Sequence, residues 1–236
     1  MNRNTGMYAG QVIGRMNGLQ VFGLDIAKSV FQVHTLNMET GEILDKRLKR
    51  EKVLEYFANR SASVVAMEAC GGAHHWARQL QKLGHQVYLV HARAVRPFVQ
   101  GNKTDVTDAR AIWLAVQQLG MRFVAIKTEV QQAALALHRQ RQQLIKMSTM
   151  QVNGLRGLLY EFGVTLPLGR KAMLAQVQSG IDSVAQVLPK MTYDSLLEQV
   201  ERIAYLRGAI DAIDVKLKEL LKQDRQMQRA LTVPGV

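Results

Sequence analysis

The sequence predicts an α/β domain with a mixed sheet and flanking helices, followed by an α-helical domain. Two observations support this prediction. Short apolar runs of strand length come first and then alternate with runs of helical spacing, whereas residues 130–160 contain no Pro and only two Gly. The chain has 236 residues, of which 47% are hydrophobic, so it is long enough for one or two domains with cores of their own.

Three strands open the first domain. Apolar runs at residues 19–25 and 30–36 are joined by the short connection 27–29, which predicts a β-hairpin. A turn at Gly41 then precedes a third strand at residues 42–48. Residues 1–18, ahead of these strands, are rich in Gly and Asn and lack the apolar core of a signal peptide, so we expect a disordered extension there.

Helices and strands alternate after the three strands. The helices are marked by apolar residues at helical spacing, and the strands are compact apolar runs. In order, the sequence predicts a helix at 51–60, a strand at 63–67, a helix ended by Gly84, a strand at 86–90 and a helix at 104–119. The order β-β-β-α-β-α-β-α is that of the RNase H-like fold, in which helices cover both faces of a mixed sheet. We therefore expect this domain to span residues 19–127.

Residues 128–228 predict a helical hairpin or a coiled-coil domain. Two apolar rows run along the second half of this segment at seven-residue spacing. The first row is Leu196, Ile203, Ile210 and Leu217, and the second is Leu206, Ile213 and Leu220. Such rows form the a/d seam of a coiled coil. The seam is compatible with packing inside one chain and with pairing of two chains. We predict that it pairs two copies of the chain as a homodimer, with packing inside one chain as the alternative.

The charge balance favours a polyanionic partner. Lys and Arg number 31 against 19 Asp and Glu, which gives a formal net charge of +12 and an isoelectric point near 10.0. Basic side chains bind a phosphate backbone by releasing its condensed counterions. Cys70 is the single cysteine, which excludes an internal disulfide and a cysteine-based zinc site. We expect a cytoplasmic, nucleoid-associated protein and no membrane contact, since no apolar run approaches the roughly 20 residues of a membrane span.

Four carboxylates occupy defined places in the predicted fold. Asp25 ends the first strand, Glu68 ends the fourth, and Asp105 and Asp108 share one face at the start of a helix. The first and fourth strands are neighbours in an RNase H-like sheet, so the four side chains should converge. Gathered carboxylates repel one another unless a cation neutralises them, and hard oxygen ligands suit Mg²⁺ or Mn²⁺. The sequence therefore predicts a metal-dependent catalytic site.

Each of these acids also has a structural alternative. Asp105 is a candidate helix N-cap, both helix-start acids complement the helix dipole, and Glu68 is a candidate solvated strand end. The same Asp-x-x-Asp spacing recurs at Asp211 and Asp214, which we interpret as helix surface.

Two stretches without any acidic residue predict contacts with nucleic acid, although each is also compatible with a solvated basic face. Residues 69–104 contain Arg78, Lys82, Arg93, Arg96 and Lys103, and residues 130–160 contain Arg139, Arg141, Lys146 and Arg156. The first stretch adjoins the carboxylates. Adjacent His74 and His75 make a poor chelate, so they are predicted to contact the substrate strand or to lie at the surface. Cys70, Trp76 and Trp113 are expected in the core.

Three segments carry a resemblance to a known family. They are GLDIAK at 23–28, MEACG at 67–71 and KTDVTDA at 103–109. Together they resemble the motifs of the DEDD transposases of the insertion-sequence one-ten family, which includes pilin gene-inverting recombinases and bridge-RNA-guided recombinases. The resemblance covers residues 19–236.

The resemblance implies a RuvC-like domain, a coiled-coil domain and a second transposase domain. It implies Mg²⁺ at Asp25, Glu68, Asp105 and Asp108, a structured guide (bridge) RNA that pairs with target and donor DNA, and a dimer that assembles into a tetramer. In the family a serine of the second transposase domain attacks DNA. Residues 229–236 look like the start of that domain, so we expect the nucleophile to be missing from this chain and strand exchange to fail. The alternatives are a self-contained RuvC-like nuclease and a non-catalytic module for nucleic-acid binding and oligomerisation.

Overall fold

The computed structural model describes residues 18–37, 39–102, 104–167, 186 and 188–223. The chain divides into two compact units, Met1–Thr128 and Glu129–Val236, each considered by itself below. The expectations for residues 1–17, for Lys103 and for residues 229–236 lie outside the described residues.

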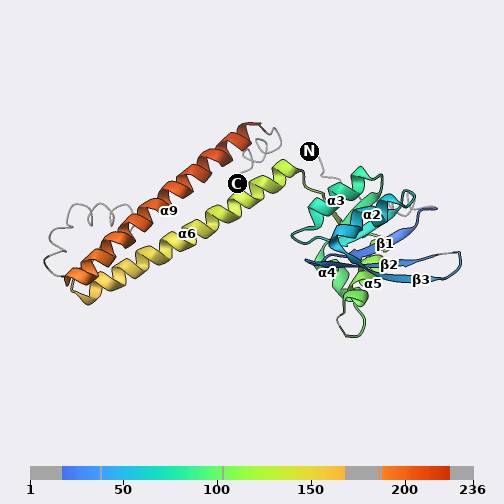
Figure 1. The fold of residues 1–236 in the computed structure, drawn as a ribbon, viewed down its shortest axis with the longest axis horizontal. Coiled ribbons are helices and arrows are strands. Elements are labelled where there is room, and N and C mark those ends of the chain that lie inside the picture. Colours follow the sequence, from blue (N-terminus) through green and yellow to red (C-terminus); the bar gives the residue numbers. More distant parts are fainter. Residues whose placement is uncertain (1–17, 38, 103, 168–185, 187, 224–236) are drawn as a thin grey trace. The chain divides into compact units, whose positions relative to one another are not determined.

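A six-stranded mixed sheet forms the framework of the first unit (Figure 1). Its strands are β1 Val21–Asp25, β2 Val30–Leu36, β3 Ile43–Lys49, β4 Val64–Glu68, β5 Gln86–Val90 and β6 Phe123–Val124, in the order β3-β2-β1-β4-β5-β6. The first three strands pair antiparallel, and β1, β4 and β5 pair parallel. This is the predicted mixed sheet with β1 beside β4. The antiparallel strand β6 was not predicted, because two residues are too few to show an alternating pattern.

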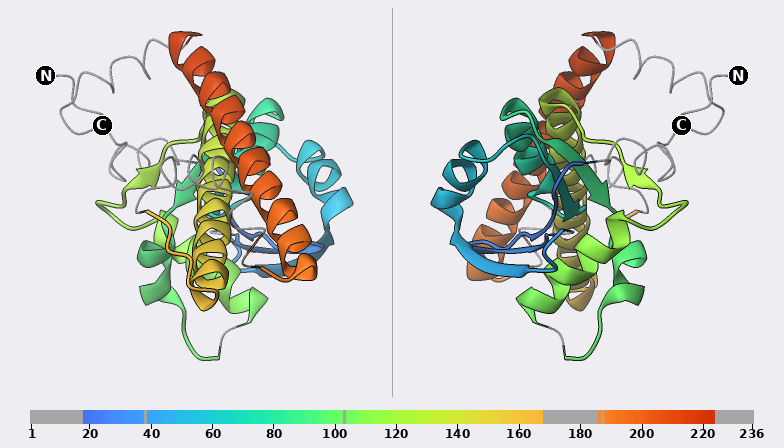
Figure 2. Two further views of the ribbon diagram at one scale, coloured as in Figure 1. Left: turned by 90° about the vertical axis from the view of Figure 1, so that its left-hand side faces the viewer. Right: turned by 90° about the vertical axis from the view of Figure 1, so that its right-hand side faces the viewer.

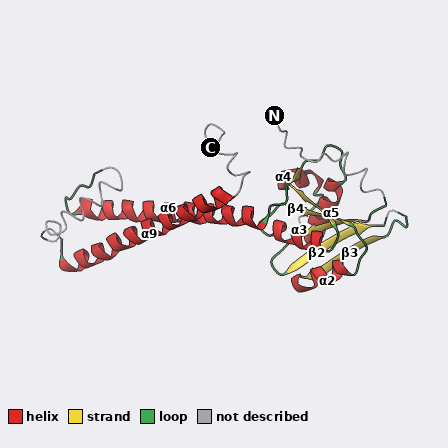
Figure 3. Cartoon of the chain, turned by 90° about the horizontal axis from the view of Figure 1, so that it is seen from above, coloured by secondary structure: helices red, strands yellow, loops and turns green. Residues whose placement is uncertain are grey.

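Helices cover both faces of the sheet, as predicted (Figures 2 and 3). The helical elements are η1 Arg50–Lys52, α2 Val53–Ala58, α3 Ala73–Lys82, α4 Ala92–Val95, η2 Arg96–Phe98 and α5 Asp105–Val116. One face packs Phe22 and Leu24 of β1 against α2 and α3. The opposite face packs Val64 and Ala66 of β4 against Ile112 of α5. The short elements α4 and η2, around Pro97, were not predicted, because one or two turns are too short to show a helical period.

The end of α3 agrees with the prediction from Gly84. This glycine has a φ of +90°, a conformation that residues with a Cβ rarely adopt. It follows the last helical turn, and its backbone N–H donates to the carbonyl oxygen of Gln81 at 3.0 Å. Gly84 therefore closes the helix and turns the chain into β5.

A helical hairpin forms the second unit. Its helices, α6 Glu129–Glu161 and α9 Lys190–Gln223, lie side by side (Figure 1). The predicted seam of α9 is buried within this chain, and Leu196 and Ile203 share a core with Leu155 and Leu159 of α6. These residues of the seam therefore pack against α6 of the same chain. Leu217, near the far end of the seam, is only half-buried. No helix among the described residues is long and apolar enough to cross a membrane.

We expect Ile210→Glu to unfold the helical hairpin at lower temperature. Ile210 is only 4% exposed, so a carboxylate there loses its hydration and the helix pair loses roughly 1.5–3 kcal/mol of apolar burial. The matched control is Val215→Glu on the same helix, since Val215 is 55% exposed. Circular dichroism melting measures both variants. Equal melting temperatures for the two would contradict the intramolecular packing of the seam.

Candidate metal centre

Two of the four predicted acids stand at the ends of neighbouring parallel strands. Asp25 is the last residue of β1 and Glu68 the last residue of β4. The strands pair in the register Leu24↔Met67, so Asp25 and Glu68 come next on both strands and project to the same face. That face is the one covered by α5, because Leu24 and Met67 belong to the core on the opposite side.

Gly23 lets α5 approach this face closely. A Cβ added at Gly23 would lie 2.2 Å from the carbonyl oxygen of Ala109 and 2.8 Å from the backbone nitrogen of Trp113. Both atoms belong to the backbone of α5. Trp113 also joins α5 to β1, since its indole N–H donates to the carbonyl oxygen of Val21 at 3.1 Å. The absence of a side chain at position 23 therefore sets how near the first turn of α5 comes to Asp25.

The first turn of α5 carries Asp105 and Asp108, but neither acid caps the helix. The N-cap is Thr104, whose hydroxyl accepts the N–H of Thr107 at 3.2 Å, while the Thr107 hydroxyl accepts the N–H of Thr104 at 2.9 Å. This reciprocal pair is a capping box. The alternative that Asp105 serves as the N-cap is excluded, and its exposed carboxylate is available to a ligand.

The four acids, here called the carboxylate cluster, interact electrostatically. Burial and the charges of Asp108 and Asp105 raise the pKa of Asp25 from 3.8 to about 6, with a smaller upward contribution from Glu68, while a backbone hydrogen bond at Ile26 opposes the rise. The charges of Glu68, Asp105 and Asp108 are therefore all close enough to Asp25 to affect its pKa. The cluster is not closed, however: within the described ranges no three Asp, Glu, His or Cys side chains are already arranged around one ion position.

The chemistry of the carboxylate cluster fits a hard divalent cation. All four side chains offer oxygen, the donor that Mg²⁺ and Mn²⁺ prefer. Burial contributes most to the raised pKa of Asp25, and repulsion by Asp108 and Asp105 comes next; a bound cation would relieve that repulsion. The backbone positions of the four acids come from two adjacent strands and one capped helix.

His74 and Arg78 hold the chain segment that follows β6. His74 is 8% exposed, and its Nδ1 accepts the backbone N–H of Lys127 at 3.2 Å. Arg78 donates to the carbonyl oxygen of the same Lys127 at 2.7 Å. Burial, then the charges of Lys127 and Arg78, lower the pKa of His74. His74 is thus not a surface residue, in contrast to exposed His75.

The residues predicted to contact nucleic acid fall into two groups in the structure. Lys82, Arg93, Arg96, Arg139 and Lys146 are exposed, whereas Arg78, Arg141 and Arg156 are partly buried. Arg141 forms a two-pronged pair with Asp214, with Nη2 and Oδ2 3.2 Å apart, so Asp214 is more than helix surface. Arg156 donates to the carbonyl oxygen of Pro167 at 2.8 Å. The exposed residues can therefore bind a phosphate without breaking a hydrogen bond like those that Arg78, Arg141 and Arg156 make within the chain.

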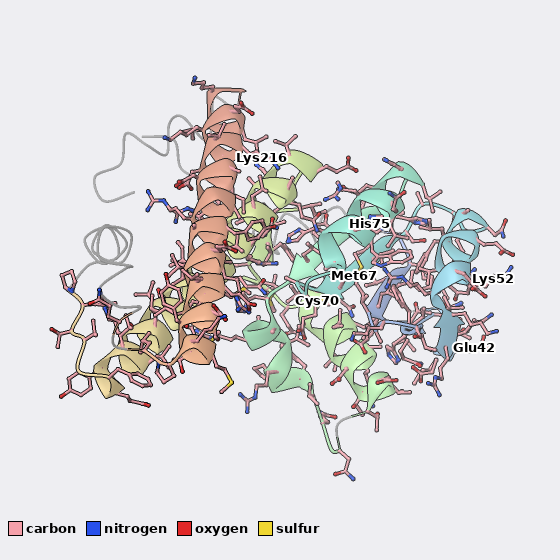
Figure 4. All side chains as sticks on the ribbon, turned by 60° about the vertical axis from the view of Figure 1, so that its left-hand side comes forward. Glu42, Lys52, Met67, Cys70, His75 and Lys216 are labelled. Carbon is pink, nitrogen blue, oxygen red and sulfur yellow. The ribbon has the colours of Figure 1, made fainter. Side chains whose placement is uncertain are left out.

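The core predictions for single residues were mostly right. Trp76 and Trp113 are 5% and 9% exposed. The prediction for Cys70 was wrong, because this residue, labelled in Figure 4, is exposed in the segment after β4. Its apolar character says little about burial beside two glycines, where the chain leaves the sheet.

One basic segment was missed by the sequence reasoning. Residues 46–52 read KRLKREK and hold five cations, but Glu51 interrupts them and the search for acid-free stretches passed over the segment. In the structure they form the exposed edge strand β3 and the turn into α2. The density of cations, rather than the absence of acids, would have found them.

Comparison with known proteins assigns the family. A family model for transposases of the DEDD type of IS110 matches residues 22–163. Among solved structures, RuvC of T. thermophilus in complex with a Holliday junction substrate aligns with 41% of this chain and 91% of that one, at 14% identity and a TM-score of 0.30. That likeness is too distant to carry an argument.

Several transposases are similar over most of this chain. A probable family 20 transposase of Pseudomonas aeruginosa is 37% identical over 92% of this chain and 65% of its own length. The transposase for insertion sequence element IS1328 of Yersinia enterocolitica is 36% identical over 94% of this chain and 65% of its own length. A putative transposase of Sinorhizobium fredii is 36% identical over 91% of this chain and 55% of its own length. The chain spans less than two thirds of each relative. The family model covers more than half of the chain and agrees with the three sequence motifs, so the chain belongs to the DEDD transposases of the IS110 family.

Proposed function

We propose that this transposase chain carries a metal-dependent centre for cutting DNA, formed by Asp25, Glu68, Asp105 and Asp108. The observation that carries the proposal is the electrostatic coupling of Asp25 to the other three acids from two strand ends and a helix start. Four carboxylates brought together at the expense of mutual repulsion are typical of a site for divalent cations rather than of a structural surface.

All four carboxylates are proposed to hold the cation, and three different elements carry them. Asp25 and Glu68 are fixed by the strand register, whereas Asp105 and Asp108 are carried by α5. Bound Mg²⁺ or Mn²⁺ would polarise the phosphodiester and stabilise the attacking and leaving oxygens. The exposed Lys82, Arg93 and Arg96 of the acid-free stretch are proposed to hold the DNA backbone on either side of that phosphodiester.

We further propose a structured guide RNA as a partner, and a dimer that assembles into a tetramer on DNA, because the family resemblance implies both. The net charge of +12 supports binding of extended nucleic acid by the chain. Exposed Arg139 and Lys146 on α6 are candidate contacts in the helical hairpin. The apolar seam of α9 does not support dimerisation, since its central residues are buried within the chain.

We expect the Asp105→Asn variant to lose Mg²⁺-dependent cutting of DNA. The substitution keeps the shape of the side chain but removes a negative ligand, so the cation is held less tightly. Asp211→Asn is the matched control, because Asp211 has the same Asp-x-x-Asp spacing on α9 and pairs with Arg207 at 2.9 Å. The measurement is nicking of labelled duplex, branched DNA and RNA–DNA hybrid in Mg²⁺, Mn²⁺ and excess chelator.

The outcomes separate the alternatives. Cutting that requires Asp105 but not Asp211 supports the metal centre, and hydrolysis without a covalent protein–DNA adduct would favour a self-contained nuclease. Binding without cutting by the wild type in either metal would favour the non-catalytic module. Cutting that survives both Asp105→Asn and chelation would overturn the proposed centre.

A further inference from the structure

A second basic surface lies at the edge of the sheet, outside the residues assigned so far. A groove of about 400 Å³ runs between β3 and α2. Five cations line it, namely Lys46, Arg47, Lys49, Lys52 and Arg60, against the single carboxylate of Glu55. Lys52 is bonded to Glu55 at 2.8 Å, which leaves the other four cations of this β3–α2 groove without a lining acid to offset them. Lys52 is marked at the outer margin of the unit in Figure 4.

Tyr56 at the bottom of the groove is surrounded by positive charge. The guanidinium of Arg60 lies 3.6 Å from the centre of the Tyr56 ring, and the ammonium of Lys46 lies 5.2 Å from it. The ring attracts each cation, but the two cations repel one another. Burial raises the pKa of the Tyr56 hydroxyl, and the nearby Arg60 guanidinium opposes that rise. An anion in the groove would attract both cations.

The groove is long enough for several phosphates. Lys46 and Lys49 are three residues apart on an extended strand, which places them about 10 Å apart along β3. One strand of duplex DNA carries a phosphate about every 3.4 Å along the helix axis. A small anion would need a few convergent donors, whereas this row of cations along a strand edge suits a polyanionic backbone.

The strand register connects the groove to the carboxylate cluster. Asp25 pairs with Gln32 of β2, and Gln32 pairs with Arg47 of β3. The three residues form one row across the sheet, so the backbone of Arg47 lies about 10 Å from that of Asp25. Only Arg47 lies on the face of the sheet that carries Asp25, and the residue between them, Gln32, is buried. Lys46 and Leu48 point to the α2 face, so a nucleic acid held at the cluster would have to pass around the edge strand β3 to enter the groove.

We propose that the β3–α2 groove binds the phosphate backbone of the DNA segment that flanks the one held at the carboxylate cluster. This inference rests on the proposed function in its choice of DNA, because Arg47, which lines the groove, lies two strands from Asp25 in the sheet. The groove itself is defined independently of the cluster and is tested without metal. Basic residues on an edge strand also prevent sheets from joining edge to edge, and the experiment separates that role from DNA binding.

Salt-dependent binding tests the groove. The affinity of a labelled DNA duplex is measured by fluorescence anisotropy in chelator over a range of salt concentrations. The groove variant combines Lys46→Gln with Lys49→Gln, and the control combines Lys216→Gln with Lys218→Gln, two exposed residues of α9. Both variants lose the same charge. We expect about tenfold weaker binding and a salt slope smaller by about 1.8 only in the groove variant, from about 0.9 per lost phosphate contact.

Each remaining outcome decides the proposal. Equal losses in the groove variant and the α9 control would overturn it, as would a groove variant that only self-associates. A change confined to an RNA duplex of the same sequence would overturn the choice of DNA. If Asp105→Asn abolishes cutting and the groove variant binds DNA more weakly, both proposals stand. If Asp105→Asn still cuts DNA while the groove variant binds DNA more weakly, only the proposed function is overturned.

Discussion

Asp25→Asn is expected to lower metal-dependent DNA cutting by about three orders of magnitude. A metal that stabilises the charge of a phosphoryl transition state contributes several kcal/mol, and about 4 kcal/mol corresponds to a thousandfold in rate. The charges of the other three acids all raise the pKa of Asp25, so Asp25 interacts with every member of the carboxylate cluster. The loss of its charge therefore reduces the attraction of the whole cluster for a cation. The measurement is the single-turnover rate in Mg²⁺ beside the wild type.

The same substitution is expected to stabilise the metal-free protein at neutral pH. The pKa of Asp25 is about 6 in the folded chain against 3.8 for an ordinary Asp, so the folded state binds the proton more tightly. The wild type therefore loses stability on this account as pH rises from about 4 through about 6, and recovers it on acidification. Asn does not titrate, so the melting temperatures of the two proteins should converge near pH 4 and separate above pH 6.

Opposite signs in the two measurements distinguish a functional acid from a structural one. Added Mg²⁺ should raise the melting temperature of the wild type and have little effect on Asp25→Asn. A variant that is less stable than the wild type at pH 7 in chelator would contradict the repulsion that we infer for the cluster. Equal responses of both proteins to Mg²⁺ would remove Asp25 from the ligand set.

Gly23→Ala is expected to destabilise the first unit by about 3 kcal/mol, at the upper end of ordinary overpacking. The new methyl group would sit 2.2 Å from the carbonyl oxygen of Ala109, and backbone atoms cannot rotate out of its way. Helix α5 must then move away from β1 and carry Asp105 and Asp108 with it. The variant should lose the Mg²⁺ response as well as stability, which thermal melting in chelator and in Mg²⁺ measures together.

Gly208→Ala in α9 is the control for the glycine substitution. A Cβ at Gly208 meets no atom within 4 Å, so the helix gains about 0.5–1 kcal/mol from the exchange of Gly for Ala. The two identical chemical changes should thus have opposite effects on stability. A Gly23→Ala protein as stable as the wild type would show that α5 does not depend on this close approach.

The sequence allowed prediction of the fold where its pattern was long and regular. The alternation of apolar runs predicted the order of the elements along the chain. The RNase H-like fold with that order then placed Asp25 and Glu68 on adjacent strand ends, as the pairing of β1 with β4 shows. Strand β6 is too short for such a pattern. Hairpin packing of the α9 seam could not be separated from dimer formation, because an apolar stripe has the same spacing whichever helix covers it.

The candidate site was predictable in its members but not in its surroundings. Residue types and spacing pointed to the four acids, but not to Thr104 as the cap that frees Asp105. Ion pairs between residues far apart in the sequence could not be predicted either. Nothing in the pattern around Arg141 indicated that it pairs with Asp214 in the other helix. Such pairings depend on tertiary distances that periodicity does not contain.

The capping box at the start of α5 has a consequence for how this enzyme family can diversify. Thr104 and Thr107 satisfy each other, and the Thr107 hydroxyl also lies 3.2 Å from the carbonyl oxygen of Asn102 in the loop that leads into the helix. The first turn therefore depends on its own two threonines and on one backbone carbonyl group, which any residue at position 102 supplies. The side chains of the connection between η2 and α5 can then vary while the two helix-borne acids stay in place.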